Sequence, residues 1–248
     1  MNLPGKKWAI INADDFGQST GVNRGVIEGH ELGVVTSASL MVRWPAAAEA
    51  AAYGREHSTL SLGIHIDLGE WAYREGTWVQ LYDVVPLDDI EAVKKETAAQ
   101  LATFQRLTGK GPTHMDSHQH VHMRQLLQPV FVETAQRLGV PLRRCNPAVR
   151  YCGEFYGQTW QGSPLLTNVS TAALIKILSG LPAGFTELEC HPAKEVDLDT
   201  MYAEERVEEL RVLCDPQVRA AIAAMEMELV SFNDILALRR ARNHEKLS

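Results

Sequence analysis

The sequence predicts an α/β fold in which parallel strands alternate with helices around a barrel. Short apolar runs rich in strand formers alternate with longer segments whose apolar residues recur every three or four positions. Several of these runs end directly in aspartate or histidine, and barrel folds build their sites at the C-terminal ends of the strands. An α/β barrel of 248 residues is commonly one domain, so a single domain over residues 1–248 is expected.

The expected helices are marked by capping residues and stop signals. Ser19 or Thr20 can cap the first helix, and Asp88 or Asp89 can cap the third, which Gly109 ends. In chain order the predicted helices cover residues 19–33, 45–53, 88–109, 126–139, 170–179, 201–213 and 216–227, with a last helix from Asp234.

The expected strands are short runs of β-branched and other apolar residues. They cover residues 8–11, 34–42, 60–68, 113–116, 140–144, 185–190 and 229–232. A turn carrying two adjacent carboxylates is expected over residues 12–17, directly after the first strand.

Two longer segments show no clear period. Residues 71–86 contain four aromatic side chains and read as an excursion over the C-terminal end of the sheet. Their rings would suit stacking on a sugar or simple anchoring of the loop, and both interpretations stay open. Residues 146–164 form a long aromatic loop, and loops of that length are usually functional or mobile.

Composition argues against two classes of partner. The formal charge of −7 and the pI near 5.7 disfavour nucleic acid, because proteins that bind it usually carry a basic face. No apolar run is long enough to span a bilayer, and the N-terminus shows no signal peptide, so a soluble, cytoplasmic protein is expected. A homodimer would match the base rate for soluble proteins.

The cysteines favour no disulfide framework. They lie far apart and form no CxxC pair, which also argues against a thiolate zinc site. Small buried residues in a reducing compartment are expected at Cys145, Cys152, Cys190 and Cys214.

A histidine-rich stretch, residues 114–122, is the strongest chemical signal. It holds four of the nine histidines in the chain, His114, His118, His120 and His122, together with Asp116. Histidine is a common metal ligand and acid–base group near neutral pH, so this density favours a metal or catalytic centre. The alternative is a polar turn whose histidines face solvent or cap the next helix.

A parallel barrel would bring several such groups to one mouth. They are Asp14, Asp15, His65, the stretch 114–122 and His191, each at or just after the end of a predicted strand. One carboxylate with two imidazoles suits a divalent metal ion that keeps positions open for water and substrate. Zinc is favoured, and magnesium, cobalt, nickel and manganese stay open. Hydrolysis is the natural use of such a site, with a second carboxylate taking a proton.

Four segments in order resemble the signature motifs of the YdjC-like carbohydrate deacetylase family. They are residues 12–17 (NADDFG), 63–65 (GIH), 114–122 (HMDSHQHVH) and 189–193 (ECHPA). The family includes chitooligosaccharide deacetylases and hopanoid-biosynthesis deacetylases. The resemblance implies a single-domain distorted TIM-like barrel, similar to that of polysaccharide deacetylases.

The resemblance also implies a role for each residue. It assigns Asp15, His65 and His118 as the ligands of one divalent metal ion. Asp14 would be the general base and His191 the general acid. Arg144 is the candidate to orient Asp14, although the adjacent Arg143 leaves that assignment open. The remaining histidines of the stretch would surround the ligands or contact substrate: His114, His120 and His122.

The implied reaction is metal-dependent removal of an N-acetyl group from an amino sugar or N-acetylated oligosaccharide, with release of acetate. A barrel metallo-isomerase or phosphoesterase is the first alternative, and a metal content near two per chain would favour it. A non-catalytic sugar-binding barrel is the second, and it would bind sugar without releasing acetate.

Overall fold

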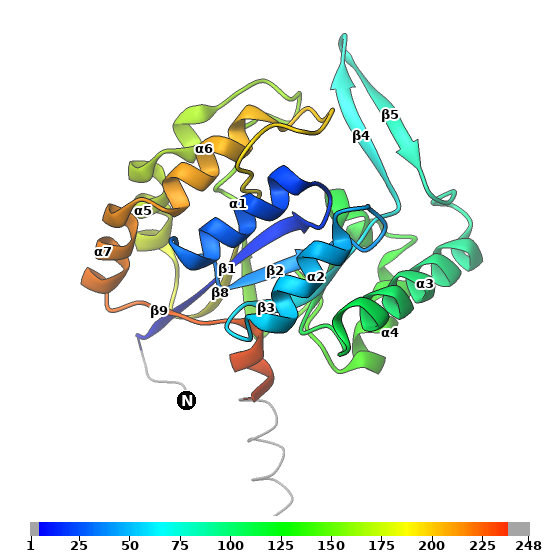
Figure 1. The fold of residues 1–248 in the computed structure, drawn as a ribbon, viewed down its shortest axis with the longest axis horizontal. Helices are drawn as coiled ribbons and strands as arrows, with labels where there is room; N and C mark the ends of the chain where they lie inside the picture. Colours follow the sequence, from blue (N-terminus) through cyan, green and yellow to red (C-terminus); the bar gives the residue numbers. More distant parts are fainter. Residues whose placement is uncertain (1–4, 238–248) are drawn as a thin grey trace, which may run out of the picture.

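Parallel strands form the sheet on which the fold is built (Figure 1). The computed structural model describes residues 5–237. The strands of this sheet are β1 (Lys7–Phe16), β2 (Ser37–Leu40), β3 (Ser61–Ile66), β6 (Met115–Ser117), β7 (Val149–Cys152), β8 (Gly184–Cys190) and β9 (Glu228–Leu229). They lie in the order β6-β3-β2-β1-β8-β7, and β9 also pairs with β1. The predicted α/β class is confirmed, and the barrel is an open half-barrel whose described edges are β6 and β7.

Helices surround this sheet (Figure 1). They are α1 (Thr20–Glu31), α2 (Ala47–Glu56), α3 (Ile90–Thr108), α4 (Gln128–Leu138), α5 (Thr171–Gly180), α6 (Glu204–Leu213) and α7 (Pro216–Ala224), with 3₁₀ turns η1 (His118–Met123) and η2 (Leu166–Val169). The predicted caps of α1 and α3 are confirmed, because Ser19 and Asp89 accept hydrogen bonds from backbone N–H groups of the first turn. The predicted stop of α3 is confirmed too, since Gly109 adopts a left-handed φ of 72°.

The first strand is longer than predicted, and this difference positions the site. Residues 12–16 continue β1 instead of forming a turn, because β8 pairs with β1 as far as Ala13. The turn-forming residues produce an irregularity between Ala13 and Phe16, where Asp15 has a φ of 63°. In a regular strand Asp14 and Asp15 would point to opposite faces, whereas here both carboxylates line one cavity.

Two further expectations about strands are wrong. Residues 71–86 do not form an irregular excursion, because β4 (Gly69–Arg74) and β5 (Thr77–Asp83) pair as an antiparallel hairpin. The side chains of β5 are exposed or half-buried, so this strand lacks the alternation of buried apolar and exposed polar residues that would have revealed it. The expected strand over 140–144 reduces to one bridge between Met115 and Leu142, while β7 lies inside the expected long loop.

The remaining expectations concern the last helix and the cysteines. Residues 232–237 are helical, and the rest of the predicted last helix lies outside the described residues. All four cysteines are free, and Cys152 and Cys190 are buried as expected, whereas Cys145 and Cys214 are partly exposed. Within residues 5–237, no helix is long and apolar enough to cross a membrane.

The strand β3 passes close to a buried histidine. A Cβ added at Gly63 would lie 2.4 Å from the ring of His114, which is stacked on Phe232 with 3.9 Å between ring centroids. The ring of His114 also contacts the hydroxyl groups of Ser39 and Thr113. Because this ring is held on several sides, it cannot move away from an added methyl group.

We therefore expect Gly63→Ala to lower the free energy of unfolding by about 1–3 kcal/mol, the usual cost of overpacking a core. Urea denaturation would measure this change. The matched control is Gly111→Ala, because a Cβ there meets no atom within 4 Å. Equal stability of the two variants would contradict the packing seen around Gly63.

Candidate metal and hydrolytic site

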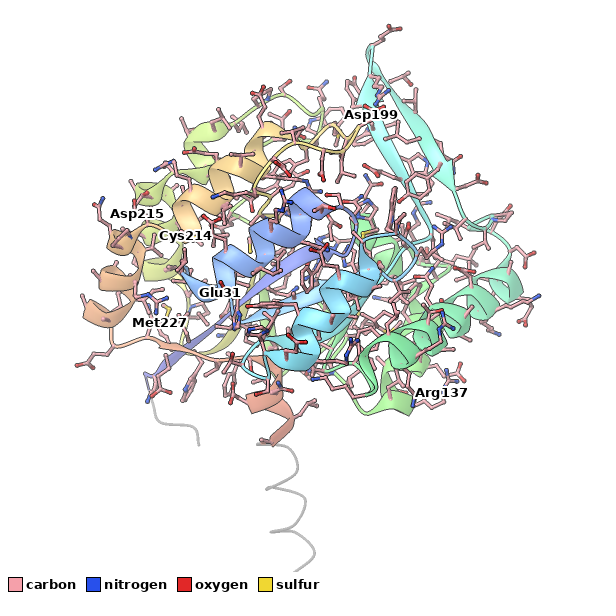
Figure 2. The ribbon with its side chains drawn as sticks, in the orientation of Figure 1. Glu31, Arg137, Asp199, Cys214, Asp215 and Met227 are labelled. Carbon is pink, nitrogen blue, oxygen red and sulfur yellow. The ribbon has the colours of Figure 1, made fainter. Side chains whose placement is uncertain are left out.

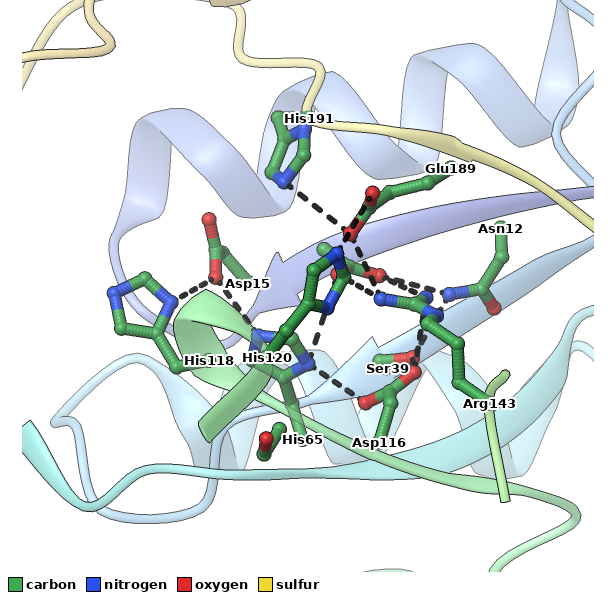
Figure 3. A network of polar contacts seen from close by, with 12 residues as sticks. Asn12, Asp15, Ser39, His65, Asp116, His118, His120, Arg143, Glu189 and His191 are labelled. Carbon is green, nitrogen blue, oxygen red and sulfur yellow. Dashed lines mark hydrogen bonds and ion pairs between the residues drawn. The ribbon is translucent and has the colours of Figure 1, made fainter. Parts of the chain in front are cut away.

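A cavity of about 550 Å³ opens where β1, β3 and β8 end. Its lining includes all five residues that the sequence analysis assigned to catalysis or metal binding, namely Asp14, Asp15, His65, His118 and His191. Figure 3 shows four of them, Asp15, His65, His118 and His191, pointing toward one another from separate segments of the chain.

Asp15, His65 and His118 form a compact group. Oδ1 of Asp15 lies 3.0 Å from Nδ1 of His118 and 3.3 Å from Nε2 of His65. Ligand atoms about 2.0–2.2 Å from a shared metal ion lie roughly this far from one another. One carboxylate oxygen and two imidazole nitrogens are also a suitable donor set for a divalent ion, so these residues fit the predicted metal.

The electrostatics of this group favour a cation. Burial raises the pKa of Asp15, but Arg206 and His118 outweigh it and hold the pKa well below its usual range. Burial lowers the pKa of His118, but Asp15 and Glu70 raise it more strongly, to about 10. The carboxylates of Asp15 and Glu70 on either side of His118 therefore favour positive charge at this position.

Asp116 orients His65. Nδ1 of His65 donates to Oδ1 of Asp116 at 2.7 Å, which leaves Nε2 directed at Asp15. The other oxygen of Asp116 accepts a hydrogen bond from Ser39 at 2.6 Å. A carboxylate on the far nitrogen is the usual support of a metal-binding histidine.

Two charged residues, Arg206 and Glu70, contact the group of Asp15, His65 and His118. The sequence analysis did not identify either of them. Nη2 of Arg206, on α6, lies 2.6 Å from Oδ2 of Asp15. The sequence does contain a sign of this contact. Arg206 and Glu209 lie on the same helix face as Leu210 and Leu213, and charged residues on an apolar face need buried partners. Glu70, on β4, was hidden because the hairpin itself was not predicted.

Glu70 faces the far side of His118. Oε2 of Glu70 lies 3.7 Å from Nε2 of His118, a buried nitrogen with no hydrogen-bond partner in the described part of the chain. Oε1 of Glu70 accepts a hydrogen bond from Thr200 at 3.0 Å, which holds the carboxylate in place. Glu70 is therefore an ion-pair partner that can support His118 from behind, at a longer distance than the hydrogen bond by which Asp116 orients His65.

Replacing Glu70 by alanine is expected to weaken metal binding by about 10–100-fold, the usual effect of losing such a support. Competition with a chromophoric chelator measures the affinity. The control is Glu133→Ala, which removes an exposed carboxylate on α4. A folded Glu70→Ala protein with wild-type metal affinity would show that Glu70 has no such role.

Arg143 orients Asp14, so the expectation that named Arg144 is wrong. The guanidinium of Arg143 binds both oxygens of Asp14, at 2.6 and 2.7 Å. Arg144 has a left-handed φ of 60° and is exposed; it lies 5.2 Å from the ring centroid of Tyr151, a ring that the buried Arg143 also contacts at 5.9 Å. The change in backbone direction sends the two neighbouring side chains to different places.

The guanidinium of Arg143 lies among four buried carboxylates. Besides Asp14, it contacts Asp116 at 3.0 Å, Glu187 at 2.7 Å and Glu189 at 2.8 Å. Burial raises the pKa of Asp14, and the charges of Arg143 and His65 lower it, with the net pKa well above the usual value. A carboxylate with a raised pKa is suited to accept a proton near neutral pH.

His191 lies across the cavity from the ligand group. Its Nε2 is 3.9 Å from Oε1 of Glu189, and its ring meets those of Tyr156 and Tyr202 edge-on. Burial lowers the pKa of His191 to about 4, although Glu189 and Asp15 act to raise it. His191 is therefore neutral near pH 7 in this environment.

The remaining histidines of residues 114–122 divide into two kinds. His120 lines the cavity, with Nε2 2.9 Å from the hydroxyl of Tyr151, so it can contact substrate. His114 belongs to the packed core, as described above. His122 is also fully buried, where Ser117 and the carbonyl of Arg143 bind its two ring nitrogens.

Comparisons with known proteins agree with this geometry. A profile of the family described as YdjC-like protein matches residues 9–224. The chain is 33% identical to a carbohydrate deacetylase of Geobacillus stearothermophilus, over 94% of this chain and 99% of that protein. It is 32% identical to a chitooligosaccharide deacetylase of Serratia marcescens, over 93% of this chain and 100% of that protein.

Solved structures show the same fold. A protein of Enterococcus faecalis V583 described as a cellobiose-phosphate cleavage protein aligns with a TM-score of 0.72 at 24% identity, covering 93% of this chain and 99% of that one. A peptidoglycan deacetylase of Bacillus subtilis aligns with a TM-score of 0.53 at 11% identity, covering 98% and 96%. The predicted similarity to the polysaccharide deacetylase fold is confirmed.

Proposed function

Because this chain belongs to the YdjC-like family, we propose that it is a metal-dependent hydrolase that removes an N-acetyl group from an amino sugar or N-acetylated oligosaccharide. The near full-length relatives named carbohydrate and chitooligosaccharide deacetylases support the reaction class. The observation that carries the proposal is the convergence of Asp15, His65 and His118 beside Asp14 in one cavity that His191 also lines.

Asp15, His65 and His118 would hold one divalent ion, and zinc suits their donor atoms best among the candidates. A bound ion supplies Lewis acidity toward the acetyl carbonyl and the attacking water. The chain itself must then move a proton from water to the leaving nitrogen, because an amide nitrogen leaves poorly as an anion.

Asp14 and His191 are suited to this proton transfer. A carboxylate oxygen of Asp14 and a ring nitrogen of His191 lie within 4.8 Å of each other. Asp14 takes the proton from water at its carboxylate, while Arg143 keeps that carboxylate oriented. Since His191 is neutral at rest, it must first receive the proton that Asp14 removed, through a bridging water or the substrate itself, and it then delivers that proton to nitrogen. The C–N bond breaks, and the products are acetate and a free amine.

The charge distribution favours one metal ion over two. Two other groups could hold a cation by geometry, one containing Asp116 and the other Glu189, and both include Asp14. Arg143 already contacts all three of these carboxylates. Its guanidinium supplies the positive charge there, which argues against the two-metal phosphoesterase and isomerase alternatives.

The test is metal analysis combined with an acetate-release assay across N-acetylated monosaccharides and oligosaccharides. We expect about one divalent ion per chain and acetate release from at least one N-acetylated sugar. Saturable sugar binding without acetate release from any of them would favour the non-catalytic alternative. A metal content near two would favour the two-metal enzymes.

A further inference from the structure

Three aromatic side chains meet beside the cavity and form an aromatic patch: Tyr73, Trp78 and Trp160. Tyr73 and Trp78 are paired across the β4–β5 hairpin, with ring centroids 5.6 Å apart. Trp160 comes from a distant loop, and its ring lies 6.0 Å from that of Tyr73. The patch is therefore built from two segments that are far apart in the sequence.

The patch is open to solvent. Trp160 is 71% exposed, the highest fraction among the exposed large apolar side chains of the described residues, and Trp78 is 45% exposed. A tryptophan that served only to anchor its loop would bury most of its ring, because burial is the source of the stabilisation. Single exposed apolar residues are common, but two tryptophans around one tyrosine form a continuous apolar surface.

Both segments hold their shape without these rings. Thr159 closes the loop around Trp160, since its backbone N–H donates to Ser163 at 2.9 Å and its carbonyl accepts from Gly162 at 2.9 Å. The hairpin turns at Glu75 and Gly76, both with positive φ, as a tight two-residue hairpin turn requires. The two tryptophans are thus presented on ordered turns, which lowers the entropy cost of binding a ligand.

The patch is continuous with the cavity. Trp78 itself lines the cavity, as do Trp71 at the base of the hairpin and Met201. The sulfur of Met201 lies 3.4 Å from the backbone nitrogen of Tyr73. A ligand that begins at Asp14 and is longer than the cavity can therefore extend onto the patch.

The surroundings of the patch favour a neutral ligand. Residues 157–163 include no charged side chain. Arg74, next to Tyr73, is paired with Asp199 at 2.9 Å, and Figure 2 shows Asp199 beside the hairpin. Among the described residues no cation stacks on these three rings, and Arg124, which lines the same cavity, lies over Trp71 instead, 5.0 Å from its centroid. The apolar C–H face of a pyranose can therefore stack on the rings of the patch, whereas a phosphate or carboxylate would find no cation on them.

We propose that the aromatic patch is a subsite for a second, uncharged pyranose ring while the N-acetylated sugar occupies the cavity, so that Trp160 sets how strongly this chain prefers a longer sugar over a monosaccharide. This inference rests on the proposed function. The second sugar ring would stack on the exposed face of Trp160. The contact between Trp160 and Tyr73 fixes the position of the tryptophan relative to the cavity.

The test compares kcat/KM for N-acetylglucosamine and N,N′,N″-triacetylchitotriose. In the wild type the trisaccharide is expected to be the better substrate. Trp160→Ala should lower the trisaccharide-to-monosaccharide ratio about five- to tenfold, and Trp160→Phe, which keeps an aromatic face, should lower it less. Leu32→Ala removes an exposed apolar side chain elsewhere and should leave the ratio unchanged. An unchanged ratio in Trp160→Ala would overturn the proposal.

Calorimetry separates this proposal from the proposed function. If the wild type releases acetate from no sugar, the proposed function fails, and binding of triacetylchitotriose then decides the role of the patch. Binding that is weakened in Trp160→Ala supports the patch, while absent binding or equal affinity in both proteins overturns it. If the wild type releases acetate and Trp160→Ala keeps the wild-type trisaccharide-to-monosaccharide ratio, only the patch proposal fails.

Discussion

Asp14→Asn is expected to lower acetate release by about 10²–10⁴-fold, the usual contribution of a general base. Asparagine has nearly the same shape and can still contact Arg143, but its amide cannot take a proton from water. Substrate KM should change little, because the proposed role of Asp14 lies in the chemical step. Steady-state kinetics with the metal-loaded protein measures both quantities.

The matched control for this substitution is Asp88→Asn, which makes the same change at an exposed position before α3. Its kcat should equal that of the wild type. Circular dichroism on both variants checks that the fold is retained. Wild-type turnover by a folded Asp14→Asn protein would exclude Asp14 as the base.

Arg143→Met is expected to cost about 3–5 kcal/mol of folding free energy, because it leaves buried carboxylates without their shared cation. Four carboxylates contact this guanidinium, as described above. Burial raises the pKa of Glu187 to about 7 even though Arg143 acts to lower it, so removing Arg143 raises it further. Acetate release should also fall strongly, since Asp14 loses the group that orients it.

The stability lost in Arg143→Met should depend on pH in a defined direction. Arg143 lowers the carboxylate pKa values in the folded protein, so its stabilising effect is present at high pH and is lost as pH falls and the carboxylates take up protons. The stability difference between wild type and Arg143→Met should therefore shrink as pH is lowered from 8 toward 5. Urea denaturation across that range measures it.

Arg144→Met is the matched control for Arg143→Met. Arg144 is exposed and contacts the face of Tyr151, a contact worth less than about 1 kcal/mol. Equal losses of stability and activity in the two variants would contradict the assignment of Arg143 as the residue that orients Asp14.

The five predicted site residues could be found from the sequence because each lies within two residues of the C-terminal end of a parallel strand. Strand ends are local features. His191 directly follows the last residue of β8, and His65 is a polar residue next to the last residue of the otherwise apolar end of β3. The parallel topology then brings distant strand ends together without any further information.

The residues that support this group could not be found in the same way. Arg206 reaches Asp15 from a helix 191 residues away, and only the packing of α6 decides that contact. Glu70 lies on a hairpin whose second strand is exposed or half-buried throughout, so the sequence shows no strand period there. The choice between Arg143 and Arg144 depends on one left-handed residue, for which the sequence carries no glycine as a signal.

The central claim has two parts: Asp15, His65 and His118 hold one divalent ion, and hydrolysis of an N-acetylated sugar requires this ion. The most direct test is to strip the protein with a chelator and measure acetate release while zinc is added back, in the wild type and in His118→Ala. We expect wild-type activity to be lost on stripping and to return to a plateau near one ion per chain, with His118→Ala recovering little. Full activity of the stripped protein, or equal recovery by His118→Ala, would contradict the claim.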